Sequence, residues 1–291
     1  MESKLKTPLV VIVGPTASGK SKLAMEIATL FDGEIITSDS WTVYKDFNIG
    51  TAKPSIDDQK LIRHHLLDVT TPREGFSAAV FKTLANKAIN DIRTRNKLPI
   101  IVGGTGLYID SLIFDYSFLP QHDKYNRLSL NALSIEELLK ITLEQGFDIS
   151  NIDTNNKRRI IRLIENDGKQ PTKNKLRPNT LIIGIEVDKE DLAGRIAKRV
   201  DIMIRDGLEQ EVNSLQKIYG WNCEPMKGIG YKEWKEYFNN NQSIEQTKEI
   251  IIASTKKLVK KQDTWFKRNK SIHWVNNQRK AVELVTTFLG K

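Results

Sequence analysis

The chain has 291 residues, 39% of them hydrophobic and 28% charged, and a formal net charge of +9. This length suffices to bury a large core, and no apolar run reaches the roughly 20 residues that cross a bilayer, which excludes a membrane-spanning protein. The single cysteine, Cys223, excludes an internal disulfide, and the four histidines form no zinc-site pattern. We therefore expect a monomeric cytoplasmic protein that binds no membrane.

Strands and helices alternate in the first third of the chain. Residues 9–14 read as a buried strand, 20–31 as a helix and 34–40 as a second strand. Residues 76–95 carry apolar side chains at helical spacing, and 98–106 form a third strand that ends in glycines. This rhythm predicts an α/β fold with a mostly parallel sheet flanked by helices on both faces.

The pattern changes after Pro120. Residues 121–177 are polar and helical, and Ser134 and Glu137 form a capping-box pattern. A strand resumes at 180–187, and helices are expected to fill most of the remaining C-terminal part, including 188–219 and 243–268. The predicted organisation is a catalytic core over 1–120 and 178–291 with basic C-terminal helices, and a helical insertion over 121–177.

Residues 14–21, GPTASGKS, match the G-x-x-x-x-G-K-[ST] motif between a predicted strand and a predicted helix. The backbone N–H groups of such a loop surround a phosphate chain, the lysine adds a positive charge, and the Ser21 hydroxyl suits Mg²⁺. The fold is therefore expected to be P-loop NTPase-like. The loop residues are Gly14, Pro15, Thr16, Ala17, Ser18, Gly19, Lys20 and Ser21.

Two other strand ends come to the same rim of a parallel sheet. The second strand ends near Asp39, whose carboxylate can orient Mg²⁺ or act as a general base, although a lone aspartate there more often caps a turn. The third strand leads to residues 103–106, where small residues allow a substrate to approach and Thr105 offers a hydroxyl.

The positive charge is concentrated in two segments. Residues 254–280 carry a net +8 and residues 156–177 a net +6, so the rest of the chain is at −5. Such clustering favours a polyanionic partner through counterion release, although lysine-rich helices can also be merely solvated faces.

These residues resemble a known family, the bacterial tRNA dimethylallyltransferases. The resemblance covers nearly the whole chain in the family's order. Its blocks are GPTASGKS, SDSWTVYKDFNIGTAKP, HHLLD, GFSAAVF, LPIIVGGTGLY, KRRIIRLIE, KGIGYKEW and STKKLVKKQDTWF. It implies Mg²⁺-assisted transfer of a dimethylallyl group from its diphosphate to N6 of the adenosine 3′ of the anticodon in tRNA. By the same resemblance, Asp39 would take the N6 proton, Thr105 would lie near the bridging oxygen, and Arg199 would reach the diphosphate.

The resemblance also implies a tRNA surface that includes the anticodon stem-loop contacts. An enzyme that acts on a base must remove it from the stack, so residues 39–42 would face the extruded base. The implied tRNA contacts are Asp39, Ser40, Trp41, Thr42, Thr105, Arg127, Arg158, Arg159, Ile160, Ile161, Arg162, Lys227, Gly228, Ile229, Gly230, Tyr231, Lys232, Lys256, Lys260, Lys261, Gln262 and Trp265. Trp265 is equally typical of a core tryptophan, and Arg199 alone of a solvated helix charge.

The chain departs from the family pattern at a few positions. Thr42 stands where glutamine is common, and Lys227 and Lys256 stand where arginine is common, so bidentate phosphate contacts become point charges. The helical insertion also looks short. None of these departures involves Lys20, Ser21, Asp39 or Thr105.

Three other functions compete with this interpretation. A small-molecule P-loop kinase would need a lid over a γ-phosphate but gains nothing from two basic segments. A prenyltransferase acting on free AMP, ADP or ATP would not need the basic C-terminal helix. An RNA-binding adaptor with a degenerate loop would not need Lys20, Ser21 and Asp39 intact.

Overall fold

The computed structural model describes residues 8–119 and 127–291, which fall into two compact units. The first unit combines Met1–Ile113 with Leu176–Lys291, and the second is Phe114–Lys175. The second unit therefore starts before residue 121, where we expected the insertion to begin. The reason is local pairing: the Ser117 N–H donates to Thr172 O at 3.1 Å, and the Asn174 N–H to Phe114 O at 2.9 Å.

The first unit is built on a sheet of six strands in the order β3-β2-β4-β1-β5-β6, in which each pair of adjacent strands runs in parallel. This confirms the predicted mostly parallel sheet. The strands are β1 (Leu9–Val13), β2 (Gly33–Ser38), β3 (His64–His65), β4 (Leu98–Gly103), β5 (Thr180–Ile185) and β6 (Ile272–Val275). The edge strand β6 was not predicted; it follows the expected helix 243–268 in a part of the chain where we expected mostly helix.

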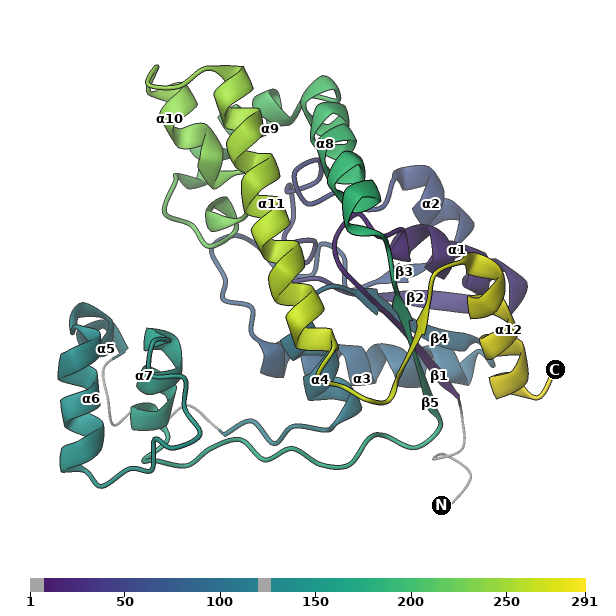
Figure 1. Ribbon diagram of the computed structural model, residues 1–291, viewed down its shortest axis with the longest axis horizontal. Helices are drawn as coiled ribbons and strands as arrows, with labels where there is room; N and C mark the ends of the chain where they lie inside the picture. Colours follow the sequence, from purple (N-terminus) through teal and green to yellow (C-terminus); the bar gives the residue numbers. More distant parts are fainter. Residues whose placement is uncertain (1–7, 120–126) are drawn as a thin grey trace. The chain divides into compact units, whose positions relative to one another are not determined.

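Helices cover both faces of this sheet (Figure 1). On one face, α1 (Lys20–Leu30) and α12 (Gln278–Leu289) pack against alternate residues of the strands, including Val10 and Ile35. On the other face lie α3 (Ala78–Thr94) and α4 (Gly106–Ile113). Alternate side chains point to opposite faces of a strand, so strands buried on both faces read as continuous apolar runs, as β1 does.

The buried carboxylate of Glu34, in β2, joins three elements. Its Oε2 lies 2.7 Å from His65 Nε2 in β3, and Arg95, which caps the C-terminal end of α3, donates to Oε1 at 3.1 Å and to Oε2 at 2.8 Å. Burial raises the pKa of Glu34, but the hydrogen bonds and charges of Arg95 and His65 outweigh it, so the pKa is lowered overall. The carboxylate therefore remains charged and ties β2, β3 and α3 together.

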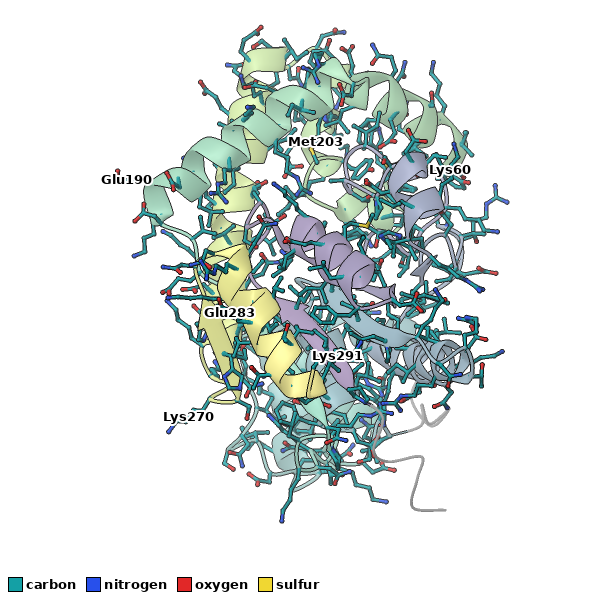
Figure 2. The ribbon with its side chains drawn as sticks, turned by 90° about the vertical axis from the view of Figure 1, so that its right-hand side faces the viewer. Lys60, Glu190, Met203, Lys270, Glu283 and Lys291 are labelled. Carbon is teal, nitrogen blue, oxygen red and sulfur yellow. The ribbon has the colours of Figure 1, made fainter. Side chains whose placement is uncertain are left out.

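A helical layer follows β5 in the chain. The predicted helix 188–219 is two helices, because Gly207 takes a left-handed conformation (φ 102°) between them. The elements of this layer are α8 (Lys189–Arg205), α9 (Leu208–Tyr219), the 3₁₀ turns η2 (Pro225–Lys227) and η3 (Lys232–Trp234), α10 (Lys235–Phe238) and α11 (Ile244–Phe266). Met203 of α8 is buried, whereas Glu190 near the start of the same helix is exposed (Figure 2). The short exposed helix α2 (Ile56–Leu61) lies in the loop region after β2.

The second unit is helical in its described part. It contains α5 (Arg127–Ala132), α6 (Ile135–Glu144) and α7 (Lys157–Glu165). The expected capping box is present at the start of α6, where the Ser134 hydroxyl accepts from the Glu137 N–H and the Glu137 carboxylate accepts from the Ser134 N–H. A small core of its own forms around Leu138, Ile160 and Ile161.

Candidate active site

The P-loop connects β1 to the first turn of α1, as the motif requires. Gly14 (φ 148°) and Gly19 (φ 94°) adopt backbone conformations that side chains disfavour, so glycine is required at both positions. A Cβ on Gly14 would also come within 3.2 Å of Ile185 O at the end of β5. The loop therefore fits closely against the end of β5. It leads into α1, whose N-terminus points toward the space beyond the C-terminal ends of the strands.

A cavity of about 90 Å³ lies in that space. The charged residues Lys20, Asp39 and Arg199 line it together with the apolar residues Ile35 and Val102. The remaining lining residues are Thr16, Ser21, Thr37, Thr42, Thr51, Ala52, Pro54, His64, Gly103, Gly104 and Gln262. A more open hollow of about 350 Å³ shares Lys20, Ser21 and Arg199 with this cavity and adds Ala17, Gly19, Lys22 and Arg195. The structure thus brings the P-loop, Asp39 and Arg199 together at one site.

Two cationic side chains share this site. Burial, with the nearby charge of Arg199, lowers the pKa of Lys20 to about 7, against a smaller opposing effect of Asp39. Burial also lowers the pKa of Arg199, and Asp39 again opposes it. The Lys20 Nζ donates to Pro15 O at 2.5 Å. Two partly desolvated cations with one carboxylate form a site that an anion such as a diphosphate would stabilise.

Asp39 is held in a fixed orientation at the end of β2. Its Oδ1 accepts from the Trp41 N–H at 2.8 Å and from the Thr42 N–H at 3.4 Å. Thr105 lies beside it, after β4, and its Oγ1 accepts from the Ser40 N–H at 3.1 Å. The rim of the sheet therefore joins the three regions that the sequence indicated: the P-loop, Asp39 to Thr42, and Thr105.

Residues 48–50, which precede lining residues of the cavity, are held by a single carboxylate from α9. The backbone N–H groups of Asn48, Ile49 and Gly50 donate to Glu211 at 2.8–3.1 Å, and the Tyr231 hydroxyl donates to the same side chain at 2.7 Å. A Cβ on Gly50 would overlap the Tyr231 ring. This arrangement orders the loop that contributes Thr51, Ala52 and Pro54 to the cavity wall.

Helix α11 has two different faces near its C-terminal end. Lys256, Lys260 and Lys261 are exposed, as a nucleic-acid surface requires. Gln262 and Trp265 instead contact the rim of the sheet: the Gln262 amide bonds to Thr16 and Gly104, and the Trp265 Nε1 donates to Asp110 Oδ2 at 3.1 Å. The polar atoms of these two half-buried side chains are thus bound within the protein, and their predicted contact with tRNA stays a prediction.

The residues of the KRRIIR stretch (157–162), in the second unit, differ in how far they are buried. Arg158 and Arg159 are exposed, whereas the side chains of Ile160 and Ile161 are fully buried in the core of this unit, which corrects their assignment as tRNA contacts. Arg127 and Arg162 are partly exposed and pair with the fully buried Glu165, at 2.7 and 3.1 Å respectively. These two arginines therefore hold their own unit together besides offering positive charge.

A similar division applies to residues 227–232. Lys227 and Lys232 are exposed, and Lys227 pairs with Glu224 at 2.9 Å. Gly228, Gly230 and Tyr231 are buried, so the Tyr231 side chain faces the protein interior, and a tRNA contact of this segment stays a prediction. Ile229 is half-buried. The Cβ position of Gly228 faces the ring of Trp41, so residues 227–232 pack against residues 39–42.

Sequence reasoning missed several lining residues. Arg195 lies one helical turn before Arg199 on α8, and this four-residue spacing was the available signal. Thr37 lies two residues before Asp39, hence on the same face of β2. His64 lines the cavity from the edge strand β3, and its Nδ1 lies 2.8 Å from Ile62 O. Burial lowers the pKa of His64, although that contact with Ile62 O opposes the shift.

Within the described residues, no group of three or more His, Cys, Asp or Glu is placed to hold a metal ion. Nor does any helix in residues 8–119 or 127–291 have the length and apolar character needed to cross a membrane.

Comparisons with known proteins point to one family. The family model described as IPP transferase matches residues 42–269. A tRNA dimethylallyltransferase of Acetivibrio thermocellus is 40% identical, over 92% of this chain and 91% of that protein. The crystal structure of a tRNA delta(2)-isopentenylpyrophosphate transferase from Staphylococcus epidermidis is 38% identical and covers 98% of this chain and 99% of its own, with a TM-score of 0.73. A eukaryotic dimethylallyltransferase acting on tRNA is 26% identical, with a TM-score of 0.82 over 98% of this chain and 80% of that one. The chain belongs to the IPP transferase family.

Proposed function

We propose that this protein is a tRNA dimethylallyltransferase. It transfers the dimethylallyl group of dimethylallyl diphosphate to N6 of the adenosine 3′ of the anticodon, and diphosphate is released. The observation that carries this proposal is the shared cavity in which the P-loop Lys20 and Arg199 face the carboxylate of Asp39. Membership of the family and the activities for which the relatives are named support the same reaction.

The leaving group would be bound by the P-loop. Its backbone N–H groups, Lys20 and Arg199 would hold the diphosphate, whose negative charge raises the pKa of Lys20 from about 7 and keeps it protonated. As the C–O bond breaks, negative charge grows on the diphosphate, so these donors stabilise the transition state more than the bound substrate. The apolar lining residues Ile35 and Val102 suit the five-carbon chain.

The accepting nitrogen would be activated at Asp39. The N6 nitrogen forms a bond to C1 of the dimethylallyl group as the C1–O bond breaks, and the N6 proton passes to the carboxylate. The two backbone N–H groups on Oδ1 fix the orientation of this carboxylate and leave Oδ2 to accept the proton. Thr105 would hold the Ser40 backbone in place and direct its own hydroxyl proton toward the diphosphate.

The residues present also suit Mg²⁺. This ion is usually held by one or two protein oxygens together with substrate phosphates, and Ser21 and Asp39 supply a hydroxyl and a carboxylate at the cavity. When bound, Mg²⁺ would neutralise part of the diphosphate charge.

The tRNA would be bound by exposed basic side chains. Those of the first unit are Lys227, Lys232, Lys256, Lys260 and Lys261, and those of the second are Arg158 and Arg159, with Arg127 and Arg162 beside them. A tRNA substrate also implies a place in the cytoplasm, as expected from composition.

The test is mass spectrometry of nucleosides after unmodified tRNA, Mg²⁺, dimethylallyl diphosphate and the protein are incubated together. We expect a mass gain of one dimethylallyl group on a single adenosine of the anticodon loop. Parallel reactions with free AMP, ADP or ATP as acceptor, and an assay for ATP consumption, separate this function from its rivals. Prenylated AMP with unmodified tRNA, or ATP consumption alone, would refute the proposal.

A further inference from the structure

The side-chain amide of Gln262 bridges two neighbouring loops that both line the cavity, the P-loop after β1 and the loop after β4. Its Oε1 accepts from the backbone N–H of Thr16 in the P-loop at 2.9 Å, and its Nε2 donates to the carbonyl oxygen of Gly104 at 3.1 Å. The approach is so close that a Cβ on Gly104 would overlap the amide. Glutamine suits this position because a primary amide accepts and donates at the same time.

The same bridge ties the basic helix α11 to the donor site. Gln262 directly follows the exposed Lys260 and Lys261, so one turn of helix carries the lysines on its outer face and the amide on its inner face. Trp265 anchors the next turn independently, through its bond to Asp110 and its contact with Gly106. Loss of the Gln262 amide would therefore leave α11 in place and release only the contact with the P-loop.

We propose that Gln262 is a positioning residue for the prenyl donor: it holds the P-loop in the conformation that binds the diphosphate and does not itself contact tRNA. The inference rests on the proposed function, in which the P-loop binds the diphosphate of the donor. Within one turn of α11, the outward Lys260 and Lys261 are thus assigned to tRNA and the inward Gln262 to the prenyl donor.

The decisive variant is Gln262→Met, which keeps the length of the side chain and removes both hydrogen bonds. Two net hydrogen bonds predict a loss of about tenfold in affinity for Mg²⁺ and inorganic pyrophosphate, measured by calorimetry. Affinity for tRNA should stay within about twofold of the wild type. The matched control is Lys261→Met, one residue earlier on the outer face, which should weaken tRNA binding and leave pyrophosphate binding unchanged.

A second variant, Gln262→Glu, gives a pH signature. The ionised carboxylate can accept from Thr16 but repels Gly104 O and adds negative charge beside the diphosphate, so pyrophosphate affinity should fall further, by about 10²-fold at pH 8. A protonated carboxyl has one donor and one acceptor, like the amide, so the defect relative to wild type should shrink as the pH falls toward 5. If Gln262 had a merely structural role, the ratio of wild-type to variant pyrophosphate affinity would not change with pH.

The outcomes are distinct. Weakened tRNA binding with unchanged pyrophosphate affinity in Gln262→Met would overturn the inference in favour of a tRNA contact, and unchanged values for both ligands would overturn it as well. Because pyrophosphate binding is measured without prenyl transfer, the inference is tested even if wild-type protein fails to modify tRNA, which would refute only the proposed function.

Discussion

The ammonium nitrogen of Lys20 lies 2.5 Å from the carbonyl oxygen of Pro15, within the same loop. This bond holds the lysine across the mouth of the P-loop, where the diphosphate would lie. We predict that Lys20→Ala lowers single-turnover prenyl transfer by about 10²-fold or more, because it removes a charge whose effect grows toward the transition state. The affinity for tRNA should change little, because the exposed lysines of α11 that are proposed to bind it do not line this cavity. Normal single-turnover chemistry in this variant would remove the P-loop from the reaction.

Asp39→Asn tests whether the carboxylate acts as a base. Asparagine keeps the size of the side chain and can still accept from the Trp41 N–H, but it cannot take the N6 proton. The transfer step should slow by roughly 10²- to 10⁴-fold while tRNA and diphosphate still bind. The measurement is the single-turnover rate at saturating donor across a Mg²⁺ series.

The same series distinguishes a metal-binding role. If Asp39 served mainly to hold Mg²⁺, added Mg²⁺ would restore the rate of the Asp39→Asn variant. Thr42→Ala is the control at the same strand end, and we expect it to alter the choice of tRNA more than the chemical step.

The exposed lysines of α11 predict a strong salt dependence. The logarithm of the tRNA affinity should fall with the logarithm of salt concentration, by roughly 0.7 to 0.9 per phosphate contacted. Replacing Lys256, Lys260 and Lys261 together with glutamine should flatten this slope, measured by filter binding between low and physiological salt. An unchanged slope would show that this face of α11 is only solvated.

The Glu34 network predicts a defined acid sensitivity. The pKa of Glu34 is lower in the folded protein than in the unfolded chain, so its stabilising effect is complete above the ordinary glutamate value of about 4.3 and is lost as the pH falls through the folded pKa. Glu34→Gln should cost about 2 kcal/mol at pH 7, because it removes the buried negative charge that binds Arg95 and leaves that arginine only its ion pair with the exposed Asp91. Below pH 4 the difference from wild type should shrink. Urea unfolding of both proteins between pH 3 and pH 7 would measure the difference in their free energies of unfolding. A difference that stays constant with pH would contradict the charged role of Glu34.

Much of the fold and the site could be predicted from local sequence. The P-loop was recognisable because its glycines have a backbone role that only glycine fills, and the strands β1 and β4 because burial on both faces leaves continuous apolar runs. Asp39 and Thr105 followed from topology, since the ends of parallel strands meet at one rim.

Other features depend on contacts between distant residues. The strand β6 is short and half-exposed, so its four residues carry little pattern of their own, and only pairing with β5 makes them a strand. Motif matching assigned whole stretches to tRNA, but periodicity within α7 turns Ile160 and Ile161 inward. The inward role of Gln262 depends on residues about 160 and 250 positions away, which no local window contains.

The order of the strands bears on how the chain is made. The central strand β1 pairs with β4 on one side and with β5 on the other, and the whole Phe114–Lys175 unit is synthesised between β4 and β5. At roughly 5–20 residues per second, this segment of about 60 residues takes on the order of 3–12 s to translate. Throughout that interval a nascent chain would present one side of an apolar strand with unpaired backbone N–H and C=O groups, a template for aggregation with a neighbouring chain. The insertion point thus sets how long β1 lacks its second partner strand during synthesis, and a variant with a shortened second unit would reduce that time.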